Sequence, residues 1–161
     1  MAAEVFSHLD PYGRARMVDI GAKPETEREA VARGRVVMRP ETLELVRRGQ
    51  VAKGDVLAVA QVAGVMAAKR TPDLIPLCHP LLINAVEMRF NFNDELSALE
   101  VEATVRVNGR TGAEMEALTA VAVAALTVYD MCKGIDPAIR IEGIRLARKR
   151  GGKSGEVVLE P

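Results

Sequence analysis

The sequence predicts an α+β fold, namely a ferredoxin-like split βαβ domain with an antiparallel sheet, helices packed on one face, and an extra helix. Apolar residues at every second position, typical of half-buried strands, occur at 28–38, 83–93, 99–107 and 138–149. Apolar residues at helical spacing occur at 40–49, 55–70 and 112–133. The resulting order of β, α, α, β, β, α, β is that of the split βαβ fold once one helix is set aside.

Length and composition suit a single catalytic domain at 24–161, preceded by an N-terminal arm at 1–23. The chain has 161 residues, which fits one domain, and 48% of them are hydrophobic. Only 3% are aromatic, so aliphatic side chains and alanine must form the core. The arm shows no sustained periodicity and carries a turn signal at Asp10-Pro11-Tyr12-Gly13. We therefore expect it to be mobile.

Proline, glycine and aspartate mark the boundaries of the first two helices. Pro40 suits the first helical position, and Gly49 suits the position just after the helix. Asp55 is a candidate N-cap for the second helix, which Thr71-Pro72 should end.

The segment 71–80 reads TPDLIPLCHP and holds three prolines. Each proline fixes its own φ and favours extended geometry in the preceding residue, so we expect a rigid, non-helical loop. Cys78 and His79 lie in it. An isolated histidine is more often structural than functional, and a cysteine without an activating base is more often a small buried hydrophobe.

The longest helix, 112–133, is apolar nearly all round, so it should be buried on more than one side. Its uninterrupted apolar run, 117–129, is too short to span a bilayer. Gly134 and Pro137 should end it.

Acidic residues flank this helix at both ends. Glu114 and Glu116 would share one side only in extended backbone, and either could simply complement the helix dipole. Asp130 and Lys133 are three residues apart and share a helix face. That spacing usually means a surface ion pair of little energetic value, but in a cleft the two groups could shift each other's pKa.

The last basic residues run into a glycine-rich segment; they are Arg145, Arg148, Lys149, Arg150 and Lys153. Clustered cations with glycine amides suit a polyphosphate, whereas composition alone favours a solvated basic tail. The GKS string is no P-loop, because Ala147 stands where that motif needs glycine and no helix is expected to follow. A short extended tail is expected after it.

Charge and cysteine content exclude several classes of protein. Lys plus Arg and Asp plus Glu are both 22, and with so few aromatics nucleic-acid binding is disfavoured. Cys78 and Cys132 lie far apart, so neither a zinc knuckle nor a disulfide framework is indicated. The N-terminus lacks the layout of a signal peptide, so we expect a cytoplasmic protein without membrane partners.

Long segments of the chain resemble the molybdenum cofactor biosynthesis protein C family. The matching motifs are MVDI at 17–20, KGD at 53–55, AAKRTPDLIPLCHPL at 67–81, TGAEMEALTAVAVAALTVYDMCK at 111–133 and GGKSG at 151–155. The resemblance as a whole covers almost everything after Arg16, whose role stays open. The resemblance implies a phosphorus–oxygen lyase that converts 3',8-cyclo-7,8-dihydro-GTP to cyclic pyranopterin monophosphate and releases pyrophosphate.

The resemblance also implies roles for individual residues. Those implied to contact the substrate are Leu77, Cys78, His79, Met115 and Glu116, with Glu114 as a further pocket residue. Asp130 is implied to be the catalytic acid or base, and Lys53, Lys133 and Lys149 match the family's functional lysines. Lys149, together with Lys153, is expected to bind phosphate.

The family is described as ferredoxin-like and hexameric, a trimer of dimers with sites between protomers. We therefore expect a homohexamer acting on a small-molecule nucleotide. No motif requires a cofactor or a metal site, although Mg²⁺ is compatible with the phosphates. The rival interpretation is a non-catalytic binding or assembly module on the same fold. Such a module has no need of both the Cys78-His79 loop and the Asp130/Lys133 pair.

Overall fold

The computed structural model describes residues 8–160 and shows an α+β domain with a five-stranded antiparallel sheet. The strands are β1 (Thr26–Val37), β2 (Ile83–Asn93), β3 (Ala98–Gly109), β4 (Arg140–Arg150) and β5 (Glu156–Val158). The helices are α1 (Pro40–Arg47), α2 (Val56–Lys69), α3 (Thr71–Leu74) and α4 (Glu114–Cys132), with a 3₁₀ turn at Gly152–Ser154. The fold is consistent with the predicted ferredoxin-like arrangement.

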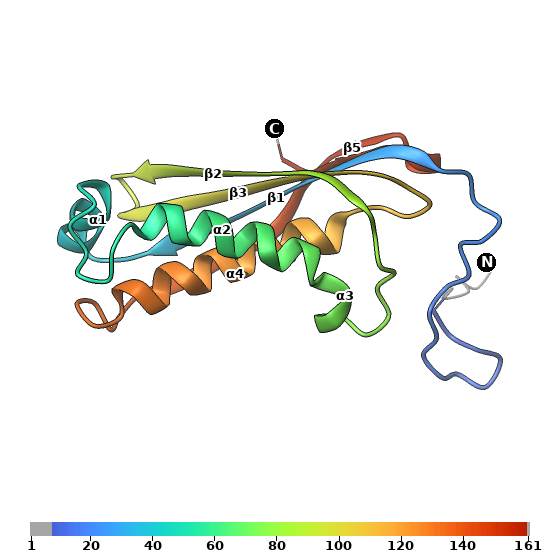
Figure 1. Ribbon diagram of the computed structural model, residues 1–161, viewed down its shortest axis with the longest axis horizontal. Helices are drawn as coiled ribbons and strands as arrows, with labels where there is room; N and C mark the ends of the chain where they lie inside the picture. The colour runs from blue at the N-terminus through green and yellow to red at the C-terminus, as the bar shows by residue number, and fades with distance from the viewer. Residues whose placement is uncertain (1–7, 161) are drawn as a thin grey trace.

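The sheet has the strand order β2-β3-β1-β4-β5, with every neighbouring pair antiparallel. β1 is central and pairs with β3 from Thr26 opposite Gly109 to Val37 opposite Ala98. This pairing brings the start of β1 to the end of β3, and the end of β4 lies beside it, with Glu29 opposite Arg150. Three segments far apart in sequence therefore meet at one end of the sheet (Figure 1).

Helices α2 and α4 form a layer on one face of the sheet, as Figure 1 shows. α4 packs against α2 on one side and against β1, β3 and β4 on the other. Its alanines at 117, 120, 124 and 125 are fully buried, which confirms that it is covered on more than one side. By length and composition α4 as a whole could cross a membrane, but its burial makes it the core helix of the domain.

Close approach of α4 to the sheet depends on Gly34 in β1. A Cβ atom there would lie 2.9 Å from Val121 Cγ1 and 3.2 Å from Ile144 Cγ1, closer than such atoms pack. The pairing of β1 with β4 is irregular between Arg33 and Arg35, so Gly34 also occupies a bulge.

Most predicted boundaries are confirmed. α1 begins at Pro40, and Gly49 beyond its end has φ +64°. Asp55 caps α2, its Oδ1 accepting a hydrogen bond from the Ala58 amide at 3.0 Å. In the arm, Asp10 Oδ1 accepts from the amides of Tyr12 and Arg14, so the turn forms, while mobility of the arm stays a prediction.

The prediction of a wholly non-helical loop at 71–80 is wrong in its first part. α3 spans Thr71–Leu74, and Pro72 lies in its first turn. Proline is tolerated there because the first amides of a helix have no intrahelical acceptor in any case. The rest of the segment is non-helical, as expected.

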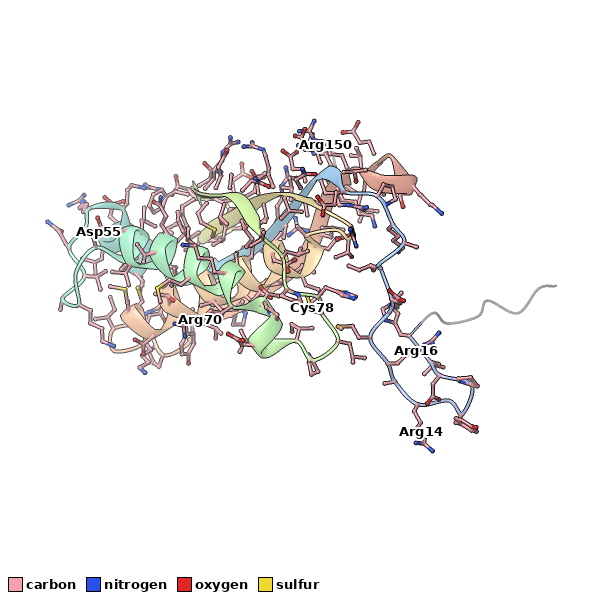
Figure 2. All side chains as sticks on the ribbon, turned by 45° about the vertical axis from the view of Figure 1, so that its right-hand side comes forward. Arg14, Arg16, Asp55, Arg70, Cys78 and Arg150 are labelled. Atoms are coloured by element: carbon pink, nitrogen blue, oxygen red, sulfur yellow. The ribbon has the colours of Figure 1, made fainter. Side chains whose placement is uncertain are left out.

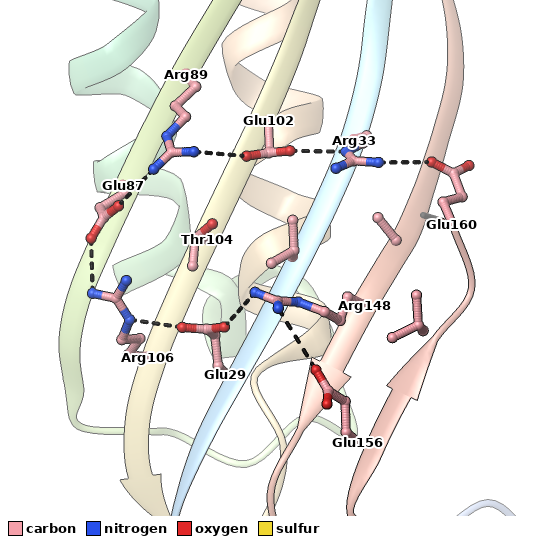
Figure 3. Close-up of a pocket in the computed structure, with 13 residues that line it drawn as sticks. Glu29, Arg33, Glu87, Arg89, Glu102, Thr104, Arg106, Arg148, Glu156 and Glu160 are labelled. Atoms are coloured by element: carbon pink, nitrogen blue, oxygen red, sulfur yellow. Dashed lines mark hydrogen bonds and ion pairs between the residues drawn. The ribbon is translucent and has the colours of Figure 1, made fainter.

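The opposite face of the sheet carries a network of ion pairs instead of a helix layer (Figure 3). Its centre is the buried carboxylate of Glu29, which accepts hydrogen bonds from Arg106 at 2.8 Å and Arg148 at 2.9 Å. Burial alone would raise the pKa of Glu29, but the Arg106 hydrogen bond and the nearby Arg150 and Arg148 charges outweigh it and lower that pKa.

Overpacking α4 is expected to destabilise the domain. Ala124 is fully buried, so Ala124→Leu must displace neighbouring atoms and should lower the free energy of unfolding by about 1–3 kcal/mol. Ala58→Leu, the same change at an exposed helical position, should have little effect. Urea unfolding followed by circular dichroism measures both, and equal effects would contradict the tight packing of α4.

Candidate functional site

The candidate residues fall into two groups at opposite ends of the helix layer. The Glu116 group comprises Leu77, Cys78, His79, Glu114, Met115, Glu116 and Lys149. The Asp130 group comprises Lys53, Asp130 and Lys133. In Figure 2, the label of Cys78 shows the end of the helix layer where the Glu116 group lies. The label of Asp55, two residues after Lys53, shows the opposite end, where the Asp130 group lies.

Glu116 is the most unusual carboxylate of the first group, because only 1% of its surface is exposed. Its Oε1 lies 3.7 Å from Cys78 Sγ, and its Oε2 is buried without a hydrogen-bond partner. Burial is the main cause that raises the pKa of Glu116, and the charge of Glu114 adds to it. A buried carboxylate with a free oxygen is costly in the protein alone and is suited to accept hydrogen bonds from a ligand.

Glu114 and Glu116 both lie in the first turn of α4 and therefore point in different directions. Glu114 Oε1 accepts from Lys149 Nζ at 3.0 Å, which joins the start of α4 to the end of β4. The carboxylate of Glu114 folds back over Gly112, where a Cβ atom would overlap it. Lys149 is thus held at the start of α4, and its role as a phosphate-binding cation stays a prediction.

The remaining members of this group come from two segments, the one after α3 and the first turn of α4. Leu77 and Met115 are partly exposed apolar side chains, at 38% and 36% exposure. Cys78 and His79 are half-buried in the segment that follows α3. Of these four residues, Cys78 is the one that contacts the buried carboxylate directly in the described residues.

Cys78 is expected to be a poor nucleophile at neutral pH. Burial first, and then the charge and hydrogen bond of Glu116, raise the pKa of its thiol to about 11. Alkylation by iodoacetamide should therefore be slow at pH 7–8 and accelerate only as the pH approaches that value, since the thiolate is the reactive form. Mass spectrometry of the Cys78 peptide across pH measures this, and fast alkylation at pH 7 would contradict it.

The Asp130 group is a carboxylate between two ammonium groups. Lys133 Nζ lies 2.8 Å from Asp130 Oδ1 and Lys53 Nζ lies 3.4 Å from Oδ2, while Lys53 also donates to the Asp130 carbonyl at 2.9 Å. Lys133, by hydrogen bond and charge, and then Lys53 lower the pKa of Asp130. All three side chains are about half exposed, so this arrangement faces outward at the end of α4.

The two groups are too far apart to act on the same atoms within one chain. Glu116 and Asp130 lie on the same helix about 14 residues apart, which corresponds to roughly 21 Å along its axis. Proton transfer requires hydrogen-bond distance, about 3 Å. The sequence analysis assigned all these residues to one site. In a single copy of the chain they form two separate groups.

A cavity of about 330 Å³ next to the Glu116 group contains residues that the sequence analysis missed. Lys23, Thr26, Arg28 and Arg110 line it together with Lys153, which was predicted. No motif spacing could have shown this, because the residues come from the start of β1, the end of β3 and the turn after β4.

Two other features do not enlarge the site. The hollow on the open sheet face in Figure 3 contains no residue of the two groups, and its charges already pair with one another. Arg148 of the predicted basic cluster lies in it and pairs with Glu29 and Glu156. Across residues 8–160, no three or more His, Cys, Asp and Glu side chains are grouped so that they could hold a metal ion.

Comparison with known proteins places this chain among close relatives. Residues 17–152 match the model of the MoaC family. A cyclic pyranopterin monophosphate synthase of Roseiflexus castenholzii is 62% identical over 154 residues, which cover 96% of this chain and 98% of that protein. Proteins with the same name from Chloroflexus aggregans and Thermomicrobium roseum are 63% and 64% identical, covering 93% and 92% of this chain and 91% and 90% of theirs.

Proposed function

We propose a mechanism from one premise: the chain belongs to the MoaC family. It is an enzyme of molybdenum cofactor biosynthesis with cyclic pyranopterin monophosphate synthase activity. We propose that it converts 3',8-cyclo-7,8-dihydro-GTP to cyclic pyranopterin monophosphate and releases pyrophosphate. The mechanism is carried by two observations: Glu116, a buried carboxylate with an unpartnered oxygen, lies two residues from the Glu114–Lys149 pair at one end of α4, and Asp130 pairs with Lys133 and Lys53 at the other.

The Glu116 group is proposed to bind the heterocycle. The guanine-derived ring presents several N–H donors, and the free Oε2 of Glu116 is an acceptor without a partner. Leu77, His79 and Met115 would line the ring. Lys149, at 3.0 Å from Glu114, and Lys153 would balance the charge of the phosphates.

The Asp130 group is proposed to handle the proton in formation of the cyclic phosphate. A ribose hydroxyl attacks the α-phosphorus, its proton passes to Asp130, and the bond to the β-phosphate breaks as pyrophosphate leaves with the electron pair. Asp130 is ionised near neutral pH, as an aspartate ordinarily is, and can therefore accept the proton; the neighbouring lysines lower its pKa further. Lys53 and Lys133 stabilise the negative charge that develops.

Because one chain holds the two groups roughly 21 Å apart, we propose that a second copy completes each site. A homohexamer built as a trimer of dimers, with the sites at protomer interfaces, provides such copies. α2 offers a surface for contact, since Val59, Val62 and Met66 share one face and are 46–59% exposed. Native mass spectrometry should give the mass of six chains.

No cofactor is needed for these steps. The phosphates could bind Mg²⁺ from solution, and residues 8–160 provide no cluster of their own for it. We propose that the enzyme works in the cytoplasm.

Incubation of the purified protein with 3',8-cyclo-7,8-dihydro-GTP tests the proposed reaction. Pyrophosphate and a pterin product should appear in equal amounts, and EDTA should not abolish turnover. Absence of both products would contradict the enzymatic function and favour the non-catalytic binding module.

The phosphate role of Lys149 is tested by the substrate affinity of Lys149→Ala. Unchanged affinity would contradict that role.

A further inference from the structure

We propose that Asp136 is a positioning residue for the Asp130 group. Its carboxylate fastens the start of α1 to the turn after α4, so that Lys53 stays against Asp130. Figure 1 shows α1 and the C-terminal end of α4 at the same end of the molecule. The inference rests on the proposed function, in which Asp130 takes the ribose proton, and adds a residue that acts through Lys53 and not on the substrate.

Asp136 is a fully buried carboxylate with donors on both oxygens. Its Oδ2 accepts a hydrogen bond from the Arg39 amide at 2.8 Å, and its Oδ1 accepts one from the Ala138 amide at 3.2 Å. Arg39 Nε lies 3.4 Å from Oδ1, and the buried Thr42 hydroxyl also donates to the carboxylate. Removing one partner of a buried, satisfied charge is costly, so the carboxylate holds Arg39 and Thr42 in place.

The contacts of Asp136 join the two segments that supply the Asp130 group. The Asp136 amide donates to the carbonyl of Cys132 at 3.0 Å, which ties it to the last residue of α4, two residues after Asp130. On the other side, Arg39 immediately precedes α1, and its Nη2 donates to the Ile135 carbonyl. The start of α1 is thus fastened to the end of α4 through Asp136.

Backbone hydrogen bonds carry this constraint along α1 to Lys53. The Gly49 amide closes α1 by donating to a carbonyl of its last turn at 3.1 Å. The Gly54 amide donates to the Val51 carbonyl at 3.0 Å in the turn that carries Lys53, and the Val51 side chain is buried in the core. Lys53 therefore reaches Asp130 from a turn whose position follows that of α1.

Asp136 and Lys53 also act on the same buried thiol. Burial first, and then the charge of Asp136, raise the pKa of Cys132, whereas the charge of Lys53 lowers it. Burial alone would raise the pKa of Asp136 itself, but the hydrogen bonds described above outweigh it and lower that pKa. Asp136 is therefore ionised near neutral pH, and its contacts persist where Asp130 acts.

Two ammonium groups act on the titration of Asp130 within residues 8–160. Lys133 of α4 lowers its pKa most, and Lys53, from the turn before α2, adds to this effect. The charge of Tyr129 acts in turn on Lys133. Displacement of Lys53 should therefore raise the pKa of Asp130, whereas the direct loss of the negative charge of Asp136 would lower it. The sign of the shift separates the two effects.

Asp136→Asn should lower kcat by about ten- to a hundredfold, because a displaced Lys53 no longer stabilises the charge that develops. KM should change little, since the ring is bound by the Glu116 group at the other end of the helix layer. The acid limb of the kcat profile should move to higher pH, following the pKa of Asp130. Glu102→Gln, which breaks a 2.9 Å ion pair with Arg33 on the open sheet face, is the control and should leave kcat and the acid limb unchanged.

Two further variants show whether the effect passes through Lys53. Lys53→Ala should itself move the acid limb to higher pH, and adding Asp136→Asn to it should give little further shift, because both changes remove the same contact. Thr42→Val removes one donor and keeps the charge of Asp136. It should fold even if Asp136→Asn does not, and it should shift the acid limb in the same direction by a smaller amount.

Carboxyl ¹³C NMR of aspartate-labelled protein measures the pKa of Asp130 without turnover. An unmoved or lowered pKa in both Asp136→Asn and Thr42→Val, or a shift fully additive with that of Lys53→Ala, would overturn the positioning role even in an active enzyme. An inactive wild type whose Asp130 pKa still rises in these variants would lose the proposed function and keep the positioning of the Asp130 group.

Discussion

Asp130→Asn is expected to lower kcat by about 10²–10⁴-fold, the usual contribution of a positioned general base. The amide cannot take the ribose proton, and it removes the negative charge between Lys53 and Lys133. The side chain is 59% exposed at the end of α4, so the fold and the melting temperature should not change. Pyrophosphate release measures kcat, and thermal unfolding measures stability.

Asp94→Asn is the matched control, because Asp94 is an exposed turn residue that pairs with Arg47 outside both groups.

Lys133→Ala tests the same role through the pH dependence of kcat. Lys133 is the main cause of the lowered pKa of Asp130, so its removal should raise that pKa and move the acid limb of the kcat profile to higher pH. Full turnover by Asp130→Asn would refute the proton-handling role.

Glu116→Gln should abolish most turnover and at the same time stabilise the protein at neutral pH. The pKa of Glu116 is raised in the folded protein, so the folded state binds this proton more readily than the unfolded state. Stability from this group is therefore present at acid pH and is lost as the pH rises through the raised pKa. The amide avoids that loss, and relief of the buried, unsatisfied carboxylate should add about 1–2 kcal/mol near pH 7.5.

Melting temperatures of the wild type and Glu116→Gln across pH test this. The gain of the variant should be a few degrees at pH 7.5 and should shrink as the pH falls toward the ordinary pKa of glutamate. Glu114→Gln, whose carboxylate is paired with Lys149, should show no such gain. A variant of Glu116 that is less stable than the wild type at pH 7.5 would mean that the carboxylate is needed for folding and not for the ligand.

Much of the fold could be predicted because local signals and packing agree. Pro40, Gly49 and Asp55 mark helix ends by backbone chemistry that acts within a few residues, and the structure uses all three. α3 was missed because proline at 72 was interpreted only as a helix breaker, whereas a first-turn proline is compatible with a helix.

The candidate site was harder to predict, since it depends on pairings between distant segments. Lys153 was found from its glycine-rich surroundings, but Lys23 and Arg28 meet it only because β1 pairs with both β3 and β4. The separation of Glu116 from Asp130 is likewise a property of the length of α4. Sequence motifs name both residues without showing that one chain keeps them apart.

The most direct test of the two-copy site is complementation between two inactive variants. Asp130→Asn and Lys149→Ala chains are co-expressed, and mixed oligomers carrying two affinity tags are purified. Suppose that each site takes its Asp130 group from one copy and its Glu116 group from another. Random mixing then gives about a quarter of the sites both intact groups, so total turnover should be about a quarter of the wild-type value. Mixed oligomers as inactive as either parent would show that one chain supplies the whole site and would contradict the proposed assembly.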